Sequence, residues 1–293
     1  MEPKRYQKKY RPRGYRHFSR EAFISRGQAL RSPLQDEVNG EVRLGIVSRH
    51  VIFGVNKSEL LQHMLIIGRS GAGKTTILRL LAMELHRLHI PFLVFDLAKY
   101  SMRYLKHEIP NLVILRCDKE FFFNPFSPPP KVRLIEWLLT FCEVTSEVFG
   151  FRAASKPFLI NKIKFLYDKF DSENSGRYPT IDDLFDLLEE LAQDKKVKSA
   201  SKDYIYRILN KLYSIKVAMG DALSVQQDIP IEELLKHPAC IELVGVNSSE
   251  VQTWIVSLIM AWIASYRTAN AHLGNTLRHA IFYDEAAQAF GKG

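Results

Sequence analysis

Short apolar runs that are rich in β-branched and aromatic residues recur along the chain and have the character of strands. They lie at 64–68, 92–96, 112–116, 240–246 and 280–284. Several runs are continuous rather than alternating, which is typical of strands buried on both faces of a parallel sheet. Helical periodicity separates them, over residues 74–88 and in a long apolar stretch at 249–267. This alternation predicts an α/β fold with a mostly parallel sheet and right-handed crossovers.

The pattern changes between residues 131 and 235, where no run of strand character occurs. The three prolines that follow Phe126 cannot continue a strand or a helix, so they mark the start of this block. The spacing of Thr180 and Asp183 predicts a capping box at the start of a helix. Amphipathic segments lie at 132–148, 155–170, 181–193 and 202–216. We interpret the block as an all-α subdomain inserted into the α/β sheet.

Charge distinguishes one further segment, the first 31 residues. These carry ten Lys or Arg and two Glu, so all but one unit of the net charge of +9 lies there. Such an arm, which also holds Tyr6, Tyr10 and Tyr15, can bind a nucleic-acid backbone and stack on bases, or bind an anionic membrane surface. The alternative is a solvated tail. A transit peptide is less favoured because the arm lacks a serine-rich amphipathic pattern.

The patterns together divide the 293 residues into four segments. We expect a basic arm at 1–40, the first part of the α/β core at 41–130, the helical insertion at 131–235 and the second part of the core at 236–293. The three cysteines are widely spaced and form no CxxC pair, which favours reduced thiols in a cytoplasmic protein. The longest apolar run, 254–266, is too short to span a bilayer and predicts a buried helix.

One motif carries specific chemistry. Residues 68–75 fit G-x-x-x-x-G-K-[ST], and we expect a strand before them and a helix after them. The amides of such a loop cradle phosphate oxygens, the Lys74 ammonium reaches the β- and γ-phosphates, and the Thr75 hydroxyl ligates Mg²⁺. The alternative is a chance glycine loop beside a solvated lysine. The residues predicted to bind ATP are Gly68, Arg69, Ser70, Gly71, Ala72, Gly73, Lys74, Thr75 and Thr76.

A nucleotide site also needs carboxylates, and the run at 280–284 ends in Asp284, which is followed by Glu285. We predict that Asp284 holds Mg²⁺ with Thr75, and that Glu285 activates the attacking water as a general base. A base beside the metal ligand favours hydrolysis over transfer to a bound acceptor. The competing interpretation is a pair of residues that caps a helix. Asp96 also ends a strand and is predicted to support the metal shell, to orient a loop, or to cap the strand end.

The order of these motifs resembles the HerA–FtsK superfamily of P-loop motor ATPases, and is most similar to HerA-like helicases and to ATPases of type IV secretion and conjugation. Five stretches carry the resemblance and cover about residues 42–293. They read HMLIIGRSGAGKTT, FLVFDLAKYSMRYL, FFFNPF, IPIEELLKHPACIELVGVNSSEVQTWIVSLIMAWI and HAIFYDEAAQAF.

The resemblance implies a RecA-like ATPase core that assembles into a ring, a homo-hexamer, with ATP between subunits and DNA driven through the central channel. By position, Lys74 and Thr75 would bind phosphate and Mg²⁺, Asp284 would hold Mg²⁺, and Glu285 would activate water. It implies sequence-tolerant DNA binding, since no zinc-finger, RRM or helix-turn-helix signature is present. It also implies a cytoplasmic location, at the inner face of the membrane through partner machinery.

Members of this superfamily continue past the second motif with a polar sensor and an arginine finger. The chain ends nine residues after Asp284, and neither feature can be assigned in it. We therefore expect a fragment or a truncated relative. Two alternatives to a DNA motor stay open: a nucleotide-dependent assembly module with little turnover, and a type IV secretion ATPase that moves protein.

Overall fold

The computed structural model describes residues 38–48, 51–151, 154–226, 228–270 and 276–285. The basic arm that the sequence predicts at 1–40 lies almost wholly outside the described residues. No helix within the described ranges is both long enough and apolar enough to cross a membrane.

A parallel four-stranded sheet lies at the centre of the fold, and its strands have the order β4-β5-β3-β6. These are β3 (Phe92–Asp96), β4 (Val113–Arg116), β5 (Ala239–Glu242) and β6 (Ala280–Asp284). Asp96, the last residue of β3, pairs in register with Glu242 on one side and with Asp284 on the other. The predicted α/β fold with a parallel sheet is confirmed, although β5 ends four residues before the expected Val246.

The prediction of a strand at 64–68 is wrong, because these residues form no regular element. β3 already has a partner on each side, and no strand among the described residues pairs with this segment. An extended apolar run without a ladder leaves its side chains in solvent, and Leu65 and Ile67 are 75% and 83% exposed.

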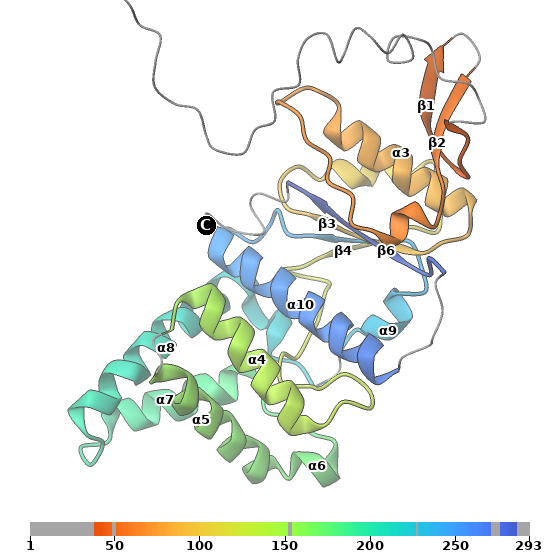
Figure 1. Ribbon diagram of the computed structural model, residues 1–293. Helices are drawn as coiled ribbons and strands as arrows, with labels where there is room; N and C mark the ends of the chain where they lie inside the picture. Colours follow the sequence, from red (N-terminus) through yellow and green to blue (C-terminus); the bar gives the residue numbers. More distant parts are fainter. Residues whose placement is uncertain (1–37, 49–50, 152–153, 227, 271–275, 286–293) are drawn as a thin grey trace, which may run out of the picture.

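An antiparallel hairpin that the hydrophobic pattern did not reveal precedes this segment. It consists of β1 (Val42–Ser48) and β2 (Val51–Val55), and the short 3-10 helix η2 (Glu59–Leu61) follows it. The hairpin lies against α3 (Lys74–Arg87), as Figure 1 shows. Arg87 on α3 donates to the carbonyl of Glu41, so the outer hairpin is tied to the helix that follows the glycine loop.

Two helices cover opposite faces of the sheet, α3 on one and α10 (Ser249–Ala269) on the other (Figure 1). Side chains alternate along β3 as the pleat requires. Phe92 and Val94 pack with the apolar face of α3, whereas Leu93 and Phe95 belong to the larger core that includes α10. The sheet is therefore buried on both faces, which explains the continuous apolar runs in its sequence.

The described regular elements between β4 and β5 are all helical. They are α4 (Leu134–Phe149), α5 (Ser155–Phe170), α6 (Ser172–Ser175), α7 (Ile181–Gln193), α8 (Ser199–Met219), η4 (Gly220–Leu223) and α9 (Ile231–Leu234). The predicted capping box is present, since Thr180 and Asp183 hydrogen-bond reciprocally at the start of α7. α10 joins this helical layer to the sheet, because Trp254 packs edge-on against Phe141 of α4 and its indole NH donates to the Thr145 hydroxyl.

Candidate functional site

The glycine loop between residue 68 and α3 is open and exposed. Gly71 and Gly73 have φ values of +77° and +90°, a region that residues with a Cβ rarely adopt. A Cβ added at either position would meet nothing within 4 Å, so the space beside the backbone is free for a ligand. Gly73 caps the N-terminus of α3 without a side-chain hydrogen bond, which leaves the amides at this end available to an anion.

Lys74 folds back over this loop. Its ammonium donates to the carbonyls of Gly68, at 2.8 Å, and Arg69, at 3.2 Å. No carboxylate forms an ion pair with Lys74 within the described ranges, so its charge is not neutralised there. A cation beside an open loop and the amides at the start of α3 fit the phosphates of a nucleotide.

Thr75 and Asp284 meet although 209 residues separate them in sequence. The Thr75 hydroxyl lies 3.4 Å from both carboxylate oxygens of Asp284, and Asp284 is only 7% exposed. A hydroxyl and a carboxylate are the hard oxygen donors that Mg²⁺ prefers, and Mg²⁺ commonly completes its shell with phosphate oxygens and water. In the described part of the chain no three His, Cys, Asp or Glu side chains gather to hold a metal alone.

Asp96 orients the loop that follows β3. Its buried carboxylate accepts hydrogen bonds from the backbone amides of Ala98, Lys99 and Met102. The Ser101 hydroxyl lies 3.3 Å from Asp96 Oδ2 and 3.1 Å from Asp284 Oδ2, so it bridges the two acids. Of the roles predicted for Asp96, loop orientation is the one that its contacts fit. Among the described residues, Ser101 is the side chain that links the Asp96 carboxylate to that of Asp284.

Glu285 follows Asp284 with a φ of 62°, which is uncommon for a residue with a side chain. Its Oε1 lies 3.3 Å from the Lys99 ammonium. Both side chains are partly open to solvent, so the ion pair is weak. Lys99 lies in the loop after β3, which therefore contacts both acids at the end of β6.

A fourth acid at this edge of the sheet, Glu242, was not singled out from the sequence. Glu242 ends β5 with a fully buried side chain, and Arg103 forms two hydrogen bonds with it, of 2.6 and 2.7 Å. These bonds raise the pKa of Arg103 above its usual value, against the opposing effect of desolvation. The Arg103 guanidinium also lies 4.4 Å from the Tyr100 ring centroid. The sequence signal was weak, because Glu242 lies inside the apolar run at 240–246, and only the early end of β5 makes it a strand-ending acid.

Arg267 of α10 lies near the end of β6 that is away from Asp284. Its guanidinium contacts Nδ1 of His279, which immediately precedes that strand, at 2.9 Å. Burial, followed by the charge of Arg267, lowers the pKa of His279 to about 3, so the imidazole is neutral. Arg267 is therefore turned away from Asp284 within its own chain.

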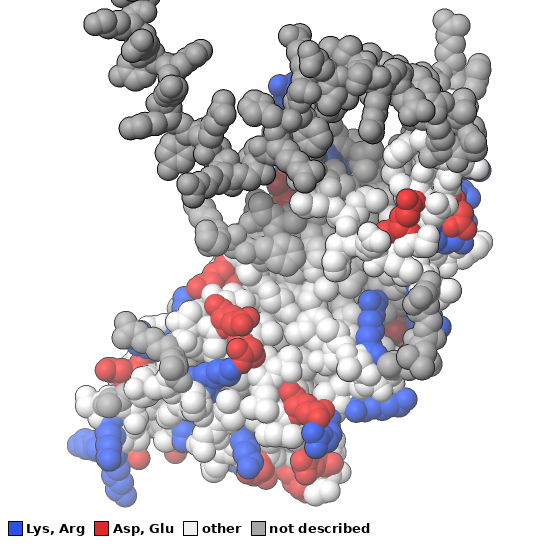
Figure 2. Space-filling view, viewed as in Figure 1, with Lys and Arg blue, Asp and Glu red and all other residues white. Residues whose placement is uncertain are grey.

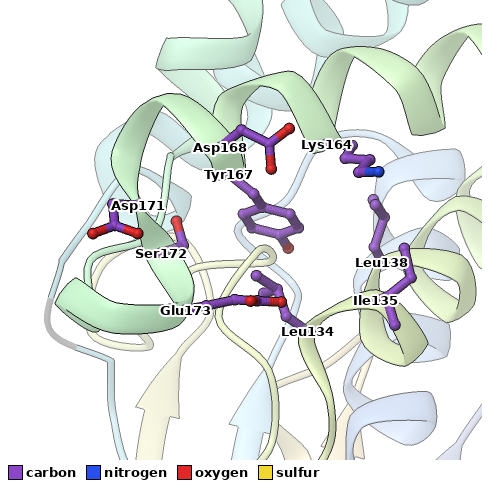
Figure 3. Close-up of a pocket in the computed structure, with 9 residues that line it drawn as sticks. All are labelled: Leu134, Ile135, Leu138, Lys164, Tyr167, Asp168, Asp171, Ser172 and Glu173. Atoms are coloured by element: carbon purple, nitrogen blue, oxygen red, sulfur yellow. The ribbon is translucent and has the colours of Figure 1, made fainter.

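A separate hollow lies in the helical layer, between the start of α4 and the end of α5 (Figure 3). It has a volume of about 270 Å³, and its lining includes Leu138, Tyr167 and Asp168. No residue of the predicted nucleotide site lines it. On the face shown in Figure 2, acidic and basic side chains are interspersed over the helical layer, and neither sign forms a continuous patch.

Comparison with known proteins gives one family match and two similar structures. Residues 42–263 match the protein family described as the central domain of helicase HerA. The fold is similar to VirB4 of Thermoanaerobacter pseudethanolicus, with a TM-score of 0.61 and 14% identity over 86% of this chain and 69% of that one. It is also similar to the bacterial conjugative coupling protein TrwBdeltaN70, with a TM-score of 0.50 and 14% identity over 84% of this chain and 66% of that one. No match was found among curated protein sequences.

Proposed function

The chain belongs to the family of the central domain of helicase HerA, a family of P-loop ATPases, and on this premise we propose that it is an ATP-hydrolysing motor that moves DNA. The family match confirms the resemblance drawn from the sequence motifs. The observation that carries the proposal is the contact between the Thr75 hydroxyl and the Asp284 carboxylate, because it places a hydroxyl from the glycine loop against an acid from a distant strand.

The nucleotide would bind at the glycine loop. The amides of residues 68–76 and the Lys74 ammonium would hold its phosphates, and the Thr75 hydroxyl and Asp284 carboxylate would ligate Mg²⁺. The chemistry that Mg²⁺ would supply at these two residues is positive charge to offset the negative charge that develops on the phosphates in hydrolysis. To reach these phosphates Lys74 must exchange its two carbonyl partners for phosphate oxygens, which are stronger acceptors.

Glu285 would accept the proton of the attacking water as general base. It adjoins the metal-binding acid, and its unusual backbone angle turns it out of the line of β6. A strained conformation at a site of this kind is consistent with a side chain held for a task rather than for packing. In this proposal the ion pair with Lys99 is the resting arrangement of the base.

We propose that the motor acts on DNA without regard to sequence, as a ring of identical subunits, a hexamer, and that it works in the cytoplasm at the inner face of the membrane. One similar structure is described as a bacterial conjugative coupling protein, which supports cargo of this kind. The basic segment 1–31 would supply phosphate contacts. A protein cargo is the alternative, since VirB4 has a similar fold.

A second candidate is an assembly module that binds ATP but turns it over slowly. The observation behind it is the ion pair between Lys99 and Glu285, because the carboxylate must leave Lys99 before it can accept a proton from water. Glu285→Gln separates the two functions. In a motor the substitution abolishes ATP turnover and leaves ATP binding intact. In an assembly module it changes neither oligomerisation nor the low rate of ATP hydrolysis.

The direct test is the steady-state ATPase rate of the protein with Mg²⁺, measured without DNA and with single- or double-stranded DNA. Lys74→Ala should abolish the rate. Glu250→Gln is the matched control for Glu285→Gln, since Glu250 also forms an ion pair with a lysine, Lys211, but lies at the start of α10. Hydrolysis that neither kind of DNA changes, together with no DNA binding, would refute the DNA motor.

A further inference from the structure

Ser101 is the first residue of the 3-10 helix η3 (Ser101–Lys106) and is almost fully buried, with 5% of its surface exposed. Its hydroxyl lies between the carboxylates of Asp96 and Asp284. Both carboxylates only accept hydrogen bonds when ionised, and a serine hydroxyl has one proton. The hydroxyl can therefore donate to one of the two acids at a time.

The distribution of other donors decides which acid receives this proton. Asp96 already accepts from three backbone amides of its own loop. Among the described residues the hydrogen bonds to the Asp284 carboxylate come from two hydroxyls, those of Thr75 and Ser101, and the Ser101 contact is the shorter at 3.1 Å. Because Asp96 is satisfied without Ser101, the serine proton is free to go to Asp284.

Ser101 is also held in place by contacts that do not involve Asp284. Arg79 of α3 donates to its backbone carbonyl at 2.7 Å. On the far side, the Arg103 guanidinium is bound to the buried Glu242 and lies over the Tyr100 ring. The hydroxyl is thus positioned by β3, α3 and β5 before any ligand arrives, which is the arrangement expected of a group that orients a metal ligand.

We propose that Ser101 is a positioning residue for Asp284, whose carboxylate it holds in the orientation that faces the Thr75 hydroxyl. The inference rests on the proposed function, in which Thr75 and Asp284 bind Mg²⁺ together. Ser101 then acts on Mg²⁺ affinity through Asp284, and has no effect on nucleotide binding in the absence of Mg²⁺, which depends on the glycine loop and Lys74.

The test compares Ser101→Thr with Ser101→Val, two side chains of nearly the same shape of which only threonine keeps the hydroxyl. The readout is the Mg²⁺ concentration that gives half-maximal binding of a fluorescent ATP analogue, with parallel titrations in EDTA. Removal of a group that orients a metal ligand typically weakens metal binding by about 10- to 100-fold. We expect that loss in Ser101→Val and in Ser101→Ala, Mg²⁺ affinity close to wild type in Ser101→Thr, and unchanged binding in EDTA for all three.

Ser214→Ala is the control, since the partner of the Ser214 hydroxyl among the described residues is a carbonyl of its own helix. Equal Mg²⁺ dependence in the threonine and valine variants would overturn the proposal. A loss of nucleotide binding in EDTA as large as the loss with Mg²⁺ would also overturn it, because the loop would then have collapsed. Asp284→Asn separates this failure from that of the proposed function. If Asp284→Asn loses the Mg²⁺ dependence and Ser101→Val keeps it, only the role of Ser101 is wrong. If the unaltered protein shows no Mg²⁺ dependence, the metal site itself is wrong.

Discussion

Asp228, near the end of the helical insertion, is bound to the segment that leads into the insertion, and its replacement by asparagine should stabilise the protein at neutral pH. Its carboxylate accepts a hydrogen bond from the backbone amide of Asn124 and another from the Ser127 side chain. The Asn124 side chain in turn donates to the carbonyl of Pro179. Burial, together with the nearby charge of Glu232, raises the pKa of Asp228 from 3.8 to about 6 despite those hydrogen bonds.

The sign and size of the effect follow from this pKa. A raised pKa in the folded state means that folding favours the protonated carboxyl. The contribution of Asp228 to the free energy of unfolding is therefore fully present below pH 3.8 and is lost as the pH rises through about 6. A difference of about 2 pH units corresponds to ~3 kcal/mol in the free energy of unfolding at most. Asparagine keeps an oxygen that can accept from the Asn124 amide and carries no charge, so Asp228→Asn should recover up to ~3 kcal/mol at pH 7.5 and almost none at pH 4.

The assay is urea unfolding at several pH values, followed by tryptophan fluorescence, with the exposed Asp221→Asn in η4 as the control. Three tryptophans are present, and Trp137 and Trp254 are fully buried in the core that includes the helical layer. The reasoning would be refuted if Asp228→Asn lowered the unfolding free energy at pH 7.5, or if its effect were the same at both ends of the pH range.

Three further results are expected. Gly245→Ala would bring a Cβ within 2.7 Å of the Asp118 carboxylate, which Arg116 holds, and thermal unfolding should show a loss of stability of about 1–3 kcal/mol. Asp118→Ala should restore the stability of this variant. If the effects of the two substitutions simply add, the steric clash is not the cause. Lys99→Ala should change ATP turnover by less than about fivefold because an exposed ion pair contributes ~0–1 kcal/mol, so a larger loss would mean that Lys99 contacts the nucleotide. Deletion of residues 1–31 should weaken DNA binding and reduce its dependence on salt concentration in fluorescence anisotropy titrations. If the salt dependence is unchanged, the segment does not contact DNA phosphates.

The sequence predicted the elements that depend on residues close together in the chain. The helices of the insertion follow from their amphipathic periodicity, and the Thr180 cap follows from a three-residue spacing. The four strands of the parallel sheet follow from continuous apolar runs, and the two central strands, β3 and β5, are buried at every position. The run at 64–68 has the same composition, but a strand also needs a partner, and composition does not encode which strands pair.

Of the candidate site, too, only the part that local sequence marks could be predicted. The glycine loop, Asp284 and Glu285 were predictable because a motif or a strand end marks each of them. The bridge through Ser101 and the pair of Arg103 with Glu242 depend on the order β5-β3-β6, which brings together residues up to 183 positions apart. The β1–β2 hairpin was missed because only one of its faces is covered, so its apolar signal is diluted; Val42 is buried whereas Ile46 is 74% exposed.

The register of the sheet has a consequence for how such a chain can change length in evolution. Asp96 is aligned with both Glu242 and Asp284, and side chains alternate between the faces of a strand. One inserted or deleted residue within β6 would turn Asp284 toward the opposite face of the sheet and away from Thr75. The connections between the helices of the insertion carry no such constraint. Related chains should therefore vary in length around the helical layer, and hardly at all within the five residues that end at Asp284.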